Sequence, residues 1–242
     1  MGLMDFALFS RLIDEAKAGG TKAITLASRG EPTLHPRFGD MLAYASDKFI
    51  DLKVNTNVTR LPEKLCHQIL SSSVNELTFS IDSHDKRIYE EIRVKGNFDE
   101  VKANVEQFRE IRARHYPQSR LHTRVSGVRF RADQDPEAFK SFWLQFVDDV
   151  GYVEVENRWD TYKNALRPEL RHPCTYLWER MYVWFDGKTN PCDVDYKSLL
   201  SPGNIKESSI TDVWRSEAYT KLRHAHLCGH RDQYNPCDRC GI

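Results

Sequence analysis

The sequence predicts an α/β fold, in which a partial barrel of parallel strands and helices (residues 1–158) precedes a small cysteine-rich domain (residues 159–242). Two observations support this division. Strand-like and helix-like segments alternate at intervals of roughly thirty residues, which is the length of a β-α-β unit. The alternation stops near residues 159–168, and five of the six cysteines lie beyond that point.

The first elements follow from apolar spacing. Residues 6–16 carry apolar side chains at helical intervals, and Gly19 and Gly20 end that pattern. Residues 22–28 are rich in strand formers, and a turn at Gly30-Glu31-Pro32 follows them. A helix is expected over 38–45 and a second strand over 49–56.

The middle of the chain repeats the alternation. Pro62 is expected to open a helix that runs to residue 70, because proline fits the first turn of a helix. Residues 74–81 predict a third strand, and a short helix is expected around Tyr89. Residues 98–111 predict a long amphipathic helix, because their apolar side chains fall on one face.

The next elements complete the predicted parallel sheet, and a hairpin and two short helices follow it. A strand is expected over 121–130, a helix over 136–147 and a fifth strand over 152–156. Strands that alternate with helices favour a parallel sheet, here one that is curved into part of a barrel. Beyond it, we expect a hairpin over 181–191 that turns at Asp186-Gly187, and short helices around Val213 and Leu222.

Composition excludes several classes of protein. Lys and Arg together number 35, as do Asp and Glu, so charge gives no reason to expect nucleic acid or an anionic membrane as a partner. No apolar run is long enough to span a bilayer. Asp5 lies where a signal peptide would be basic, so we expect a cytoplasmic protein. Disulfides are disfavoured in that compartment, and cysteine clusters there more often hold metals.

Four late cysteines are the strongest chemical signal. Cys174, Cys192, Cys237 and Cys240 include one C-x-x-C pair, and thiolates are soft ligands suited to zinc or to an iron–sulfur cluster. These residues alone leave both metals open. Cys66 lies in an apolar helical pattern and is expected in the core, whereas Cys228 is close enough to the C-x-x-C to substitute as a ligand.

Polar side chains follow each predicted strand. In a parallel barrel the loops at the carboxyl ends of the strands build the active site. Hydroxyl, amide, carboxylate and guanidinium groups at these ends suit a ribose or an amino acid zwitterion. The residues are Ser28 to Pro32, Asn55 to Asn57, Ser80 and Asp82, Arg124 and Ser126, and Glu156, Asn157 and Trp159.

At these strand ends the chain resembles the radical S-adenosylmethionine (radical SAM) superfamily. Residues 28–36 resemble the family's Gly-Gly-Glu-Pro motif, with Arg29 where the first glycine usually stands, and residues 55–57 resemble its Thr-Asn-Gly strand end. The resemblance implies that S-adenosylmethionine binds here, with its amino group at the Glu31 motif, its ribose near Ser80 or Asp82 and its carboxylate near Arg124. The cofactor-binding residues it implies are Gly30, Glu31, Pro32, Asn55, Asn57, Ser80, Asp82, Arg124 and Ser126.

The cysteine region resembles the SPASM/twitch extension of the same superfamily. The likeness includes the Asp186-Gly187 hairpin, Pro191-Cys192, Gly203-Asn204-Ile205 and the final C-x-x-C. It implies one auxiliary [4Fe–4S] cluster as the metal centre, held by the four late cysteines, as in the one-cluster form found in aminocyclitol dehydrogenases.

One departure concerns the cluster that generates the radical. No three cysteines have the family's C-x-x-x-C-x-x-C spacing, and the first barrel strand that precedes it is also not found. We interpret this as truncation of a longer protein rather than loss of the chemistry. A second [4Fe–4S] cluster is therefore expected only in a full-length form, and this chain alone is expected to be inactive.

The resemblance implies an oxidoreductase. The cofactor would yield a 5′-deoxyadenosyl radical that removes a hydrogen atom from a sugar or aminocyclitol alcohol, or from a peptide side chain, and the auxiliary cluster would accept an electron. Expected partners are that substrate and an electron donor such as flavodoxin or ferredoxin, with no nucleic acid and no membrane. The alternative is a non-enzymatic barrel or scaffold with a structural zinc on the four cysteines.

No catalytic residue is named from the sequence. The substrate cavity is assigned to Glu156, Asn157, Trp159, Tyr176 and Trp178, and a core position is an equally good interpretation of the aromatic residues among them. Four histidines, at positions 35, 172, 224 and 226, are able to ligate or shuttle protons, but a structural role is the better interpretation of each.

Overall fold

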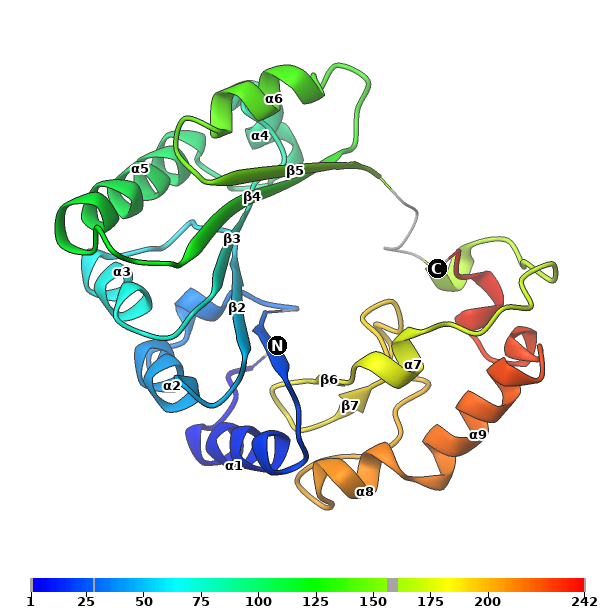
Figure 1. Ribbon diagram of the computed structural model, residues 1–242. Coiled ribbons are helices and arrows are strands. Elements are labelled where there is room, and N and C mark those ends of the chain that lie inside the picture. The colour runs from blue at the N-terminus through cyan, green and yellow to red at the C-terminus, as the bar shows by residue number, and fades with distance from the viewer. Residues whose placement is uncertain (1, 28, 156–160, 242) are drawn as a thin grey trace. The chain divides into compact units, whose positions relative to one another are not determined.

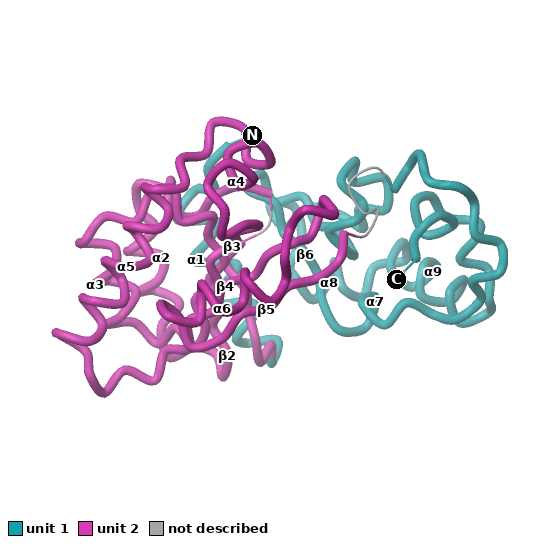
Figure 2. The backbone as a smooth tube through the Cα atoms, turned by 90° about the horizontal axis from the view of Figure 1, so that it is seen from above, with its two compact units in different colours: residues 1–20, 156–242 teal, residues 21–155 magenta. Residues whose placement is uncertain are grey.

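The computed structural model describes residues 2–27, 29–155 and 161–241. The chain divides into two compact units, of which one comprises residues 21–155 and the other residues 1–20 together with 156–242 (Figure 2). The predicted boundary between residues 158 and 159 falls close to the second junction. The structure adds that the first twenty residues group with the C-terminal unit.

The unit of residues 21–155 contains one five-stranded parallel sheet (Figure 1). Its strands lie side by side in the order in which they occur in the chain. They are β1 (Ala23–Leu26), β2 (Asp51–Thr56), β3 (Glu76–Ser80), β4 (His122–Arg129) and β5 (Asp149–Glu154). Because crossovers between parallel strands are right-handed, this consecutive order places every connecting helix on the same face of the sheet. The prediction of a parallel α/β sheet is therefore confirmed.

Helices cover that one face (Figure 1). They are α2 (Phe38–Ala45), α3 (Glu63–Leu70), α4 (Lys86–Ile92), α5 (Phe98–His115) and α6 (Pro136–Trp143), with a 3₁₀ turn, η1 (Pro32–Leu34), before α2. Side-chain caps fix several starts: Asp85, Asn97 and Asp135 accept hydrogen bonds from backbone N–H groups in the first turns of α4, α5 and α6.

The two faces of the sheet differ in character. Along β2, Leu52, Val54 and Thr56 are buried, whereas Asp51, Lys53 and Asn55 are half-buried. This alternation follows from the two-residue period of a strand. One face thus packs against the helices, and the other carries polar side chains that remain available to a ligand.

The other unit begins with α1 (Phe6–Ala18) and continues after the sheet. Its remaining elements are short. They are η2 (Thr161–Lys163), α7 (Tyr176–Glu179), an antiparallel hairpin of β6 (Tyr182–Val183) and β7 (Thr189–Asn190), α8 (Ile210–Trp214), α9 (Glu217–Leu227), η3 (Arg231–Gln233) and η4 (Cys237–Arg239). A small apolar core of Leu177, Tyr219 and Leu222 joins α7 to α9.

Helix α1 is hydrogen-bonded to two residues of the C-terminal region. Arg11 donates a hydrogen bond to the carbonyl oxygen of Ile205, and Oε2 of Glu15 accepts one from the backbone N–H of Ile210 at 2.8 Å. These contacts tie α1 to α8 across nearly the whole length of the chain, and they account for the grouping of residues 1–20 with the C-terminal unit.

The predicted boundaries differ most around β5. This strand begins at Asp149 rather than at residue 152, and α6 ends at Trp143 rather than at residue 147. A polar start looked unsuited to a strand, but Asp148, just before it, accepts hydrogen bonds from the backbone and hydroxyl of Thr123. The short helix α7 was not predicted, because four residues are too few to show helical spacing.

Within the described ranges, none of the helices combines the length and the apolar character that crossing a bilayer requires.

Candidate functional site

Four thiols face one pocket in the C-terminal unit. Cys174, Cys192, Cys237 and Cys240 all line it, and they come from three separate stretches of chain. Cys174 precedes α7, Cys192 follows β7, and Cys237 and Cys240 lie at the start and just after the end of η4. Leu177, Pro191, Val194 and Pro236 complete an otherwise largely apolar lining. Folding thus collects the four cysteines that the sequence places far apart.

Burial changes the acidity of these thiols. It raises the pKa of Cys174 and that of Cys237, and it raises the pKa of Cys192 to about 12. Neighbouring cysteines contribute in the same direction, since one thiolate disfavours the next. The raised pKa values of Cys174, Cys192 and Cys237 favour the neutral thiol, whereas a bound metal deprotonates its sulfur ligands.

The donor set of this pocket suits a metal ion or a cluster. Thiolates are soft ligands, and four of them are the usual set for structural zinc and for iron–sulfur clusters. Structural zinc takes four sulfur atoms at about 2.3 Å from one ion, whereas in a [4Fe–4S] cluster each thiolate binds a different iron. Four thiols around one pocket are compatible with either group.

The other two cysteines lie elsewhere. Cys66 is fully buried in α3, where its thiol donates to the carbonyl oxygen of Leu61, in agreement with the predicted core role. Cys228 is exposed at the end of α9 and lies 3.6 Å from Nε2 of His224. Neither residue lines the four-cysteine pocket.

Two buried basic side chains also line the pocket. Arg231 is 1% exposed and donates hydrogen bonds to the carbonyl oxygens of His172, Cys237 and Cys240. It therefore fixes the backbone that carries the C-x-x-C pair, and it places a positive charge beside four potential thiolates. His226 is fully buried, and its Nδ1 accepts a hydrogen bond from the backbone N–H of Cys174.

The sequence favoured a structural role for His226 but did not place it beside the cysteines, and it missed Arg231. His226 follows Tyr219 and Leu222 at intervals of three and four residues, so all three lie on the buried face of α9. A histidine at a core position was the available signal. Burial, with the nearby charge of Arg231, lowers the pKa of His226 to about 4. No local pattern marks Arg231, because its acceptors come from residues brought together only by folding.

Glu31 joins the ends of two strands in the sheet unit. Its Oε1 accepts hydrogen bonds from the backbone and hydroxyl of Thr33, at 3.0 and 2.7 Å, and from the hydroxyl of Thr56 at 2.6 Å. Its Oε2 accepts from the backbone N–H of Asn57 at 2.6 Å. The predicted clusters at Gly30 to Pro32 and Asn55 to Asn57 are thus one structure, with Glu31 as their bridge.

Asp82 bridges the third and fourth strands in the same way. Its Oδ1 accepts from the backbone N–H of Val128 at 3.0 Å, and its Oδ2 accepts from Nε of Arg93 at 2.5 Å. The residue is only 3% exposed. Since these partners already use its carboxylate, the structure favours Ser80 over Asp82 for contact with a ligand.

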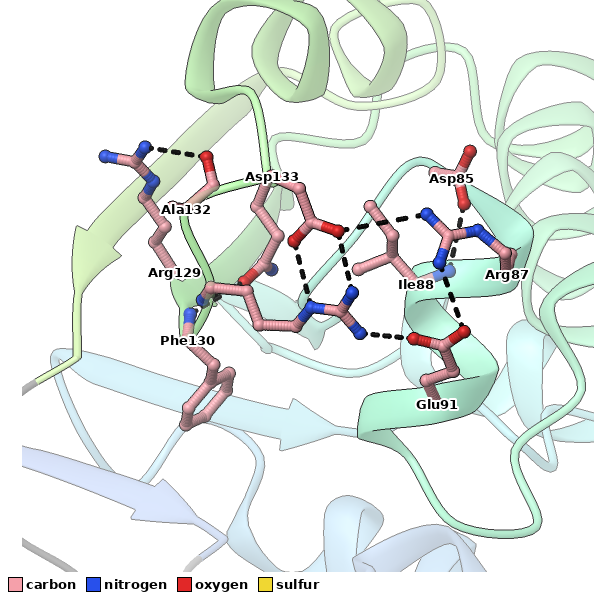
Figure 3. Close-up of polar contacts among 10 residues, drawn as sticks. Asp85, Arg87, Ile88, Glu91, Arg129, Phe130, Ala132 and Asp133 are labelled. Carbon is pink, nitrogen blue, oxygen red and sulfur yellow. Dashed lines mark hydrogen bonds and ion pairs between the residues drawn. The ribbon is translucent and has the colours of Figure 1, made fainter.

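Surface ion pairs brace the segments that follow β3 and β4 (Figure 3). Arg131 pairs with Asp133 and with Glu91 of α4, and Arg87 of α4 pairs with Glu91 and Asp133. Hydrogen bonds from Arg131 lower the pKa of both Glu91 and Asp133. The network joins α4, which directly precedes Arg93, to the turn after β4.

The predicted ligand residues Asn55, Ser80, Arg124 and Ser126 share one face of the sheet. Asn55 and Arg124 lie in one register row across β2 to β5, which also contains Thr78 and Asp149. Ser80 and Ser126 are partners in the row toward the carboxyl ends. Adjacent strands lie about 4.8 Å apart, so these groups form a continuous polar surface. Arg124 lies 3.3 Å from Asp149, and its guanidinium covers Gly151, where even a Cβ atom would clash.

Of the residues assigned to the substrate cavity and the first strand end, only some lie in the described part of the chain. Ser28, Glu156, Asn157 and Trp159 lie outside the described residues. Tyr176 lines the four-cysteine pocket, whereas Trp178 is 41% exposed and does not. The roles of the cofactor-binding and metal-binding residues stay predictions that the geometry allows.

A parallel α/β sheet with polar strand ends and a pocket of four thiols are typical of a cofactor-binding protein with a separate cysteine-rich domain. The family model described as the radical SAM superfamily matches residues 2–135, and one described as the SPASM iron–sulfur cluster-binding domain matches residues 174–241. This chain belongs to the radical SAM superfamily and carries a SPASM domain. The fold and the cofactors predicted for the family, iron–sulfur and S-adenosylmethionine, are confirmed.

Curated relatives agree with this assignment. A tungsten-containing aldehyde ferredoxin oxidoreductase cofactor-modifying protein of Pyrococcus furiosus is 35% identical over 92% of this chain and 75% of its own. The S-adenosyl-L-methionine-dependent 2-deoxy-scyllo-inosamine dehydrogenase of Niallia circulans is 33% identical over 22% of each chain.

Solved structures share the fold. BtrN in complex with AdoMet and 2-DOIA matches all of this chain and 82% of its own, with a TM-score of 0.64 and 18% identity. SuiB of Streptococcus suis bound to the precursor peptide SuiA matches 97% of this chain and 68% of its own, with a TM-score of 0.69 and 12% identity.

Proposed function

We propose that the four late cysteines hold one auxiliary [4Fe–4S] cluster and that the polar sheet face binds S-adenosylmethionine. The enzyme would then oxidise a substrate alcohol or peptide side chain. The pocket that collects Cys174, Cys192, Cys237 and Cys240 carries this proposal, because it gathers four soft ligands in a largely apolar lining. Bound together, these cofactors supply hydrogen-atom abstraction and an acceptor for the electron that remains.

Residues of the sheet unit would position S-adenosylmethionine. We assign its carboxylate to Arg124, whose guanidinium lies on the polar face, and its hydroxyl groups to Ser80, Ser126 and Asn55 in the same two rows. The Gly30-Glu31-Pro32 turn and Asn57 would shape the place of the amino group, since Glu31 orders both strand ends. Asp82 would support this surface from behind through Val128.

The names of two relatives support a proposal for the substrate class. One is named as a 2-deoxy-scyllo-inosamine dehydrogenase, and the other is named as a cofactor-modifying protein. We therefore favour a sugar-like or aminocyclitol alcohol over a peptide side chain. A small electron-transfer protein such as flavodoxin or ferredoxin would supply electrons. Since the sequence has no C-x-x-x-C-x-x-C, this chain alone would not start the reaction.

Metal analysis tests the auxiliary site. Anaerobic reconstitution with iron and sulfide should give a brown protein with about four irons per chain. Cys237→Ala should lose most of that iron and the visible absorbance, because the variant removes one of the four thiols lining the pocket. Cys228→Ala is the matched control and should keep the full iron content, since Cys228 is exposed and outside the pocket.

The second candidate is a non-enzymatic scaffold with structural zinc. It is favoured only by the donor set, because four thiolates are also a zinc site. Zinc at about one per chain after purification, with no iron uptake on reconstitution, would replace the enzyme proposal by this one.

A further inference from the structure

One polar atom next to the cysteines has no partner. Nε2 of His226 is buried, and it makes no hydrogen bond to the part of the chain that the structure describes. The side chain itself is fully buried and lines the pocket of the four thiols. A buried ring nitrogen without a partner is unfavourable, so its retention at this position needs an explanation.

The other ring nitrogen fixes where the proton lies. Nδ1 of His226 accepts a hydrogen bond from the backbone N–H of Cys174 at 3.2 Å, so Nδ1 carries no proton. The single proton of the neutral imidazole must then be on Nε2. His226 is therefore a rigid N–H donor in the pocket wall, and its orientation is set by the residue that carries one of the four thiols.

The pocket offers this donor few acceptors of its own. Its lining is apolar apart from the four thiols, the hydroxyl of Tyr176 and Arg231, which can only donate. The carbonyl oxygens of Cys237 and Cys240 already accept from Arg231. Nε2 has no partner in the described chain, so a group bound in the pocket would give it a hydrogen-bond acceptor.

We propose that Nε2–H of His226 donates a hydrogen bond to a sulfur atom of the bound auxiliary cluster and thereby raises its reduction potential. This inference depends on the proposed iron–sulfur site and assigns it a residue that is not a ligand. Hydrogen bonds to the sulfur atoms are one determinant of cluster potential, because they stabilise the reduced state, which carries the extra negative charge. Together with Arg231, the donor would make this cluster a better electron acceptor.

Potentiometry and pulsed EPR of the anaerobically reconstituted chain test this inference. His226→Phe keeps a ring of similar size but has no N–H, so its cluster should have a lower potential at unchanged iron content. His226→Gln presents an amide N–H near the position of Nε2 and should recover part of the shift. His224→Phe is the matched control on the same helix, exposed and outside the pocket, and should leave the potential unchanged.

Isotope labelling of histidine tests the proposed hydrogen bond between His226 and the cluster directly. In protein with ¹⁵N-histidine, the reduced cluster should show a weak nitrogen coupling that disappears in His226→Phe. Equal potentials and couplings in wild type and His226→Phe would overturn the inference, as would the strong coupling of a directly bonded nitrogen. Loss of the cluster in both the Phe and the Gln variants would assign His226 a purely structural role. A wild-type chain that takes up no iron would instead refute the proposed function.

Discussion

Single side chains connect strand ends in this protein. Glu31 gathers four hydrogen bonds from Thr33, Thr56 and Asn57, and Asp82 links Val128 to Arg93. Both carboxylates were predicted from the sequence as ligand contacts, because acids at strand ends often face an active site. Their structural use was not predictable, since it depends on the register between strands far apart in the chain.

Removing the Glu31 carboxylate should weaken the sheet unit. Glu31→Ala should lower the free energy of unfolding by about 2–3 kcal/mol, because hydrogen bonds to a charged group contribute about 1.5–3 kcal/mol and Thr56 loses its acceptor. Urea unfolding followed by fluorescence measures this change. Glu110→Ala, on the exposed face of α5, is the control and should shift stability by less than about 0.5 kcal/mol. Unchanged stability in Glu31→Ala would mean that its role is ligand binding alone.

At the scale of elements, apolar periodicity predicted the helices well. The bounds of α2 agree with the prediction, and α5 extends it by four residues at its C-terminal end. Strands were predicted one or two residues too long at most ends, because apolar residues continue into the loops. The start of β5 was missed, since Asp148 just before it and Asp149, its first residue, are stabilised by Thr123 and Arg124 of the neighbouring strand.

Asp148 should give the sheet unit an acid-sensitive stability. Burial acts to raise the pKa of its carboxyl group, but hydrogen bonds from Thr123 and Arg112 outweigh it, and the pKa is lowered below its ordinary value. A lowered folded-state pKa adds stability above the unfolded value of about 4, and this stability is lost as the pH falls through the folded value.

The variant Asp148→Asn isolates this contribution. It should be less stable than the wild type at pH 7, because Asn cannot form the ion pair with Arg112 at 2.7 Å. The difference should shrink as the pH falls below about 4, where the wild-type carboxylate becomes protonated. Denaturant midpoints measured from pH 7 to pH 3 give the comparison. Parallel curves for the two proteins would show that Asp148 does not titrate with folding.

At the scale of the whole molecule, sequence order and structural grouping disagree. The sequence placed residues 6–16 in the barrel, because a helix directly precedes the first strand. The structure groups α1 with the cysteine unit through Arg11 and Glu15. No local pattern contains this information, since the acceptor of Arg11 lies 194 residues away.

Breaking one of these bonds should loosen the C-terminal unit selectively. Glu15→Ala removes the acceptor of the Ile210 N–H, which is the first residue of α8. Amide hydrogen exchange should quicken in α1 and α8 and stay unchanged in β3 and β4. Lys17→Ala, exposed in the last turn of α1, serves as the control. Equal acceleration throughout the sheet would show that the two units unfold as one.

The pairing of α1 with α8 also affects how the protein is made. A ribosome releases α8 almost two hundred residues after α1. At 5–20 residues per second, α1 waits on the order of ten seconds or more for its partner, whereas each strand of the sheet meets its neighbour soon after synthesis. The sheet can therefore assemble during translation before the contacts between α1 and α8 are able to form.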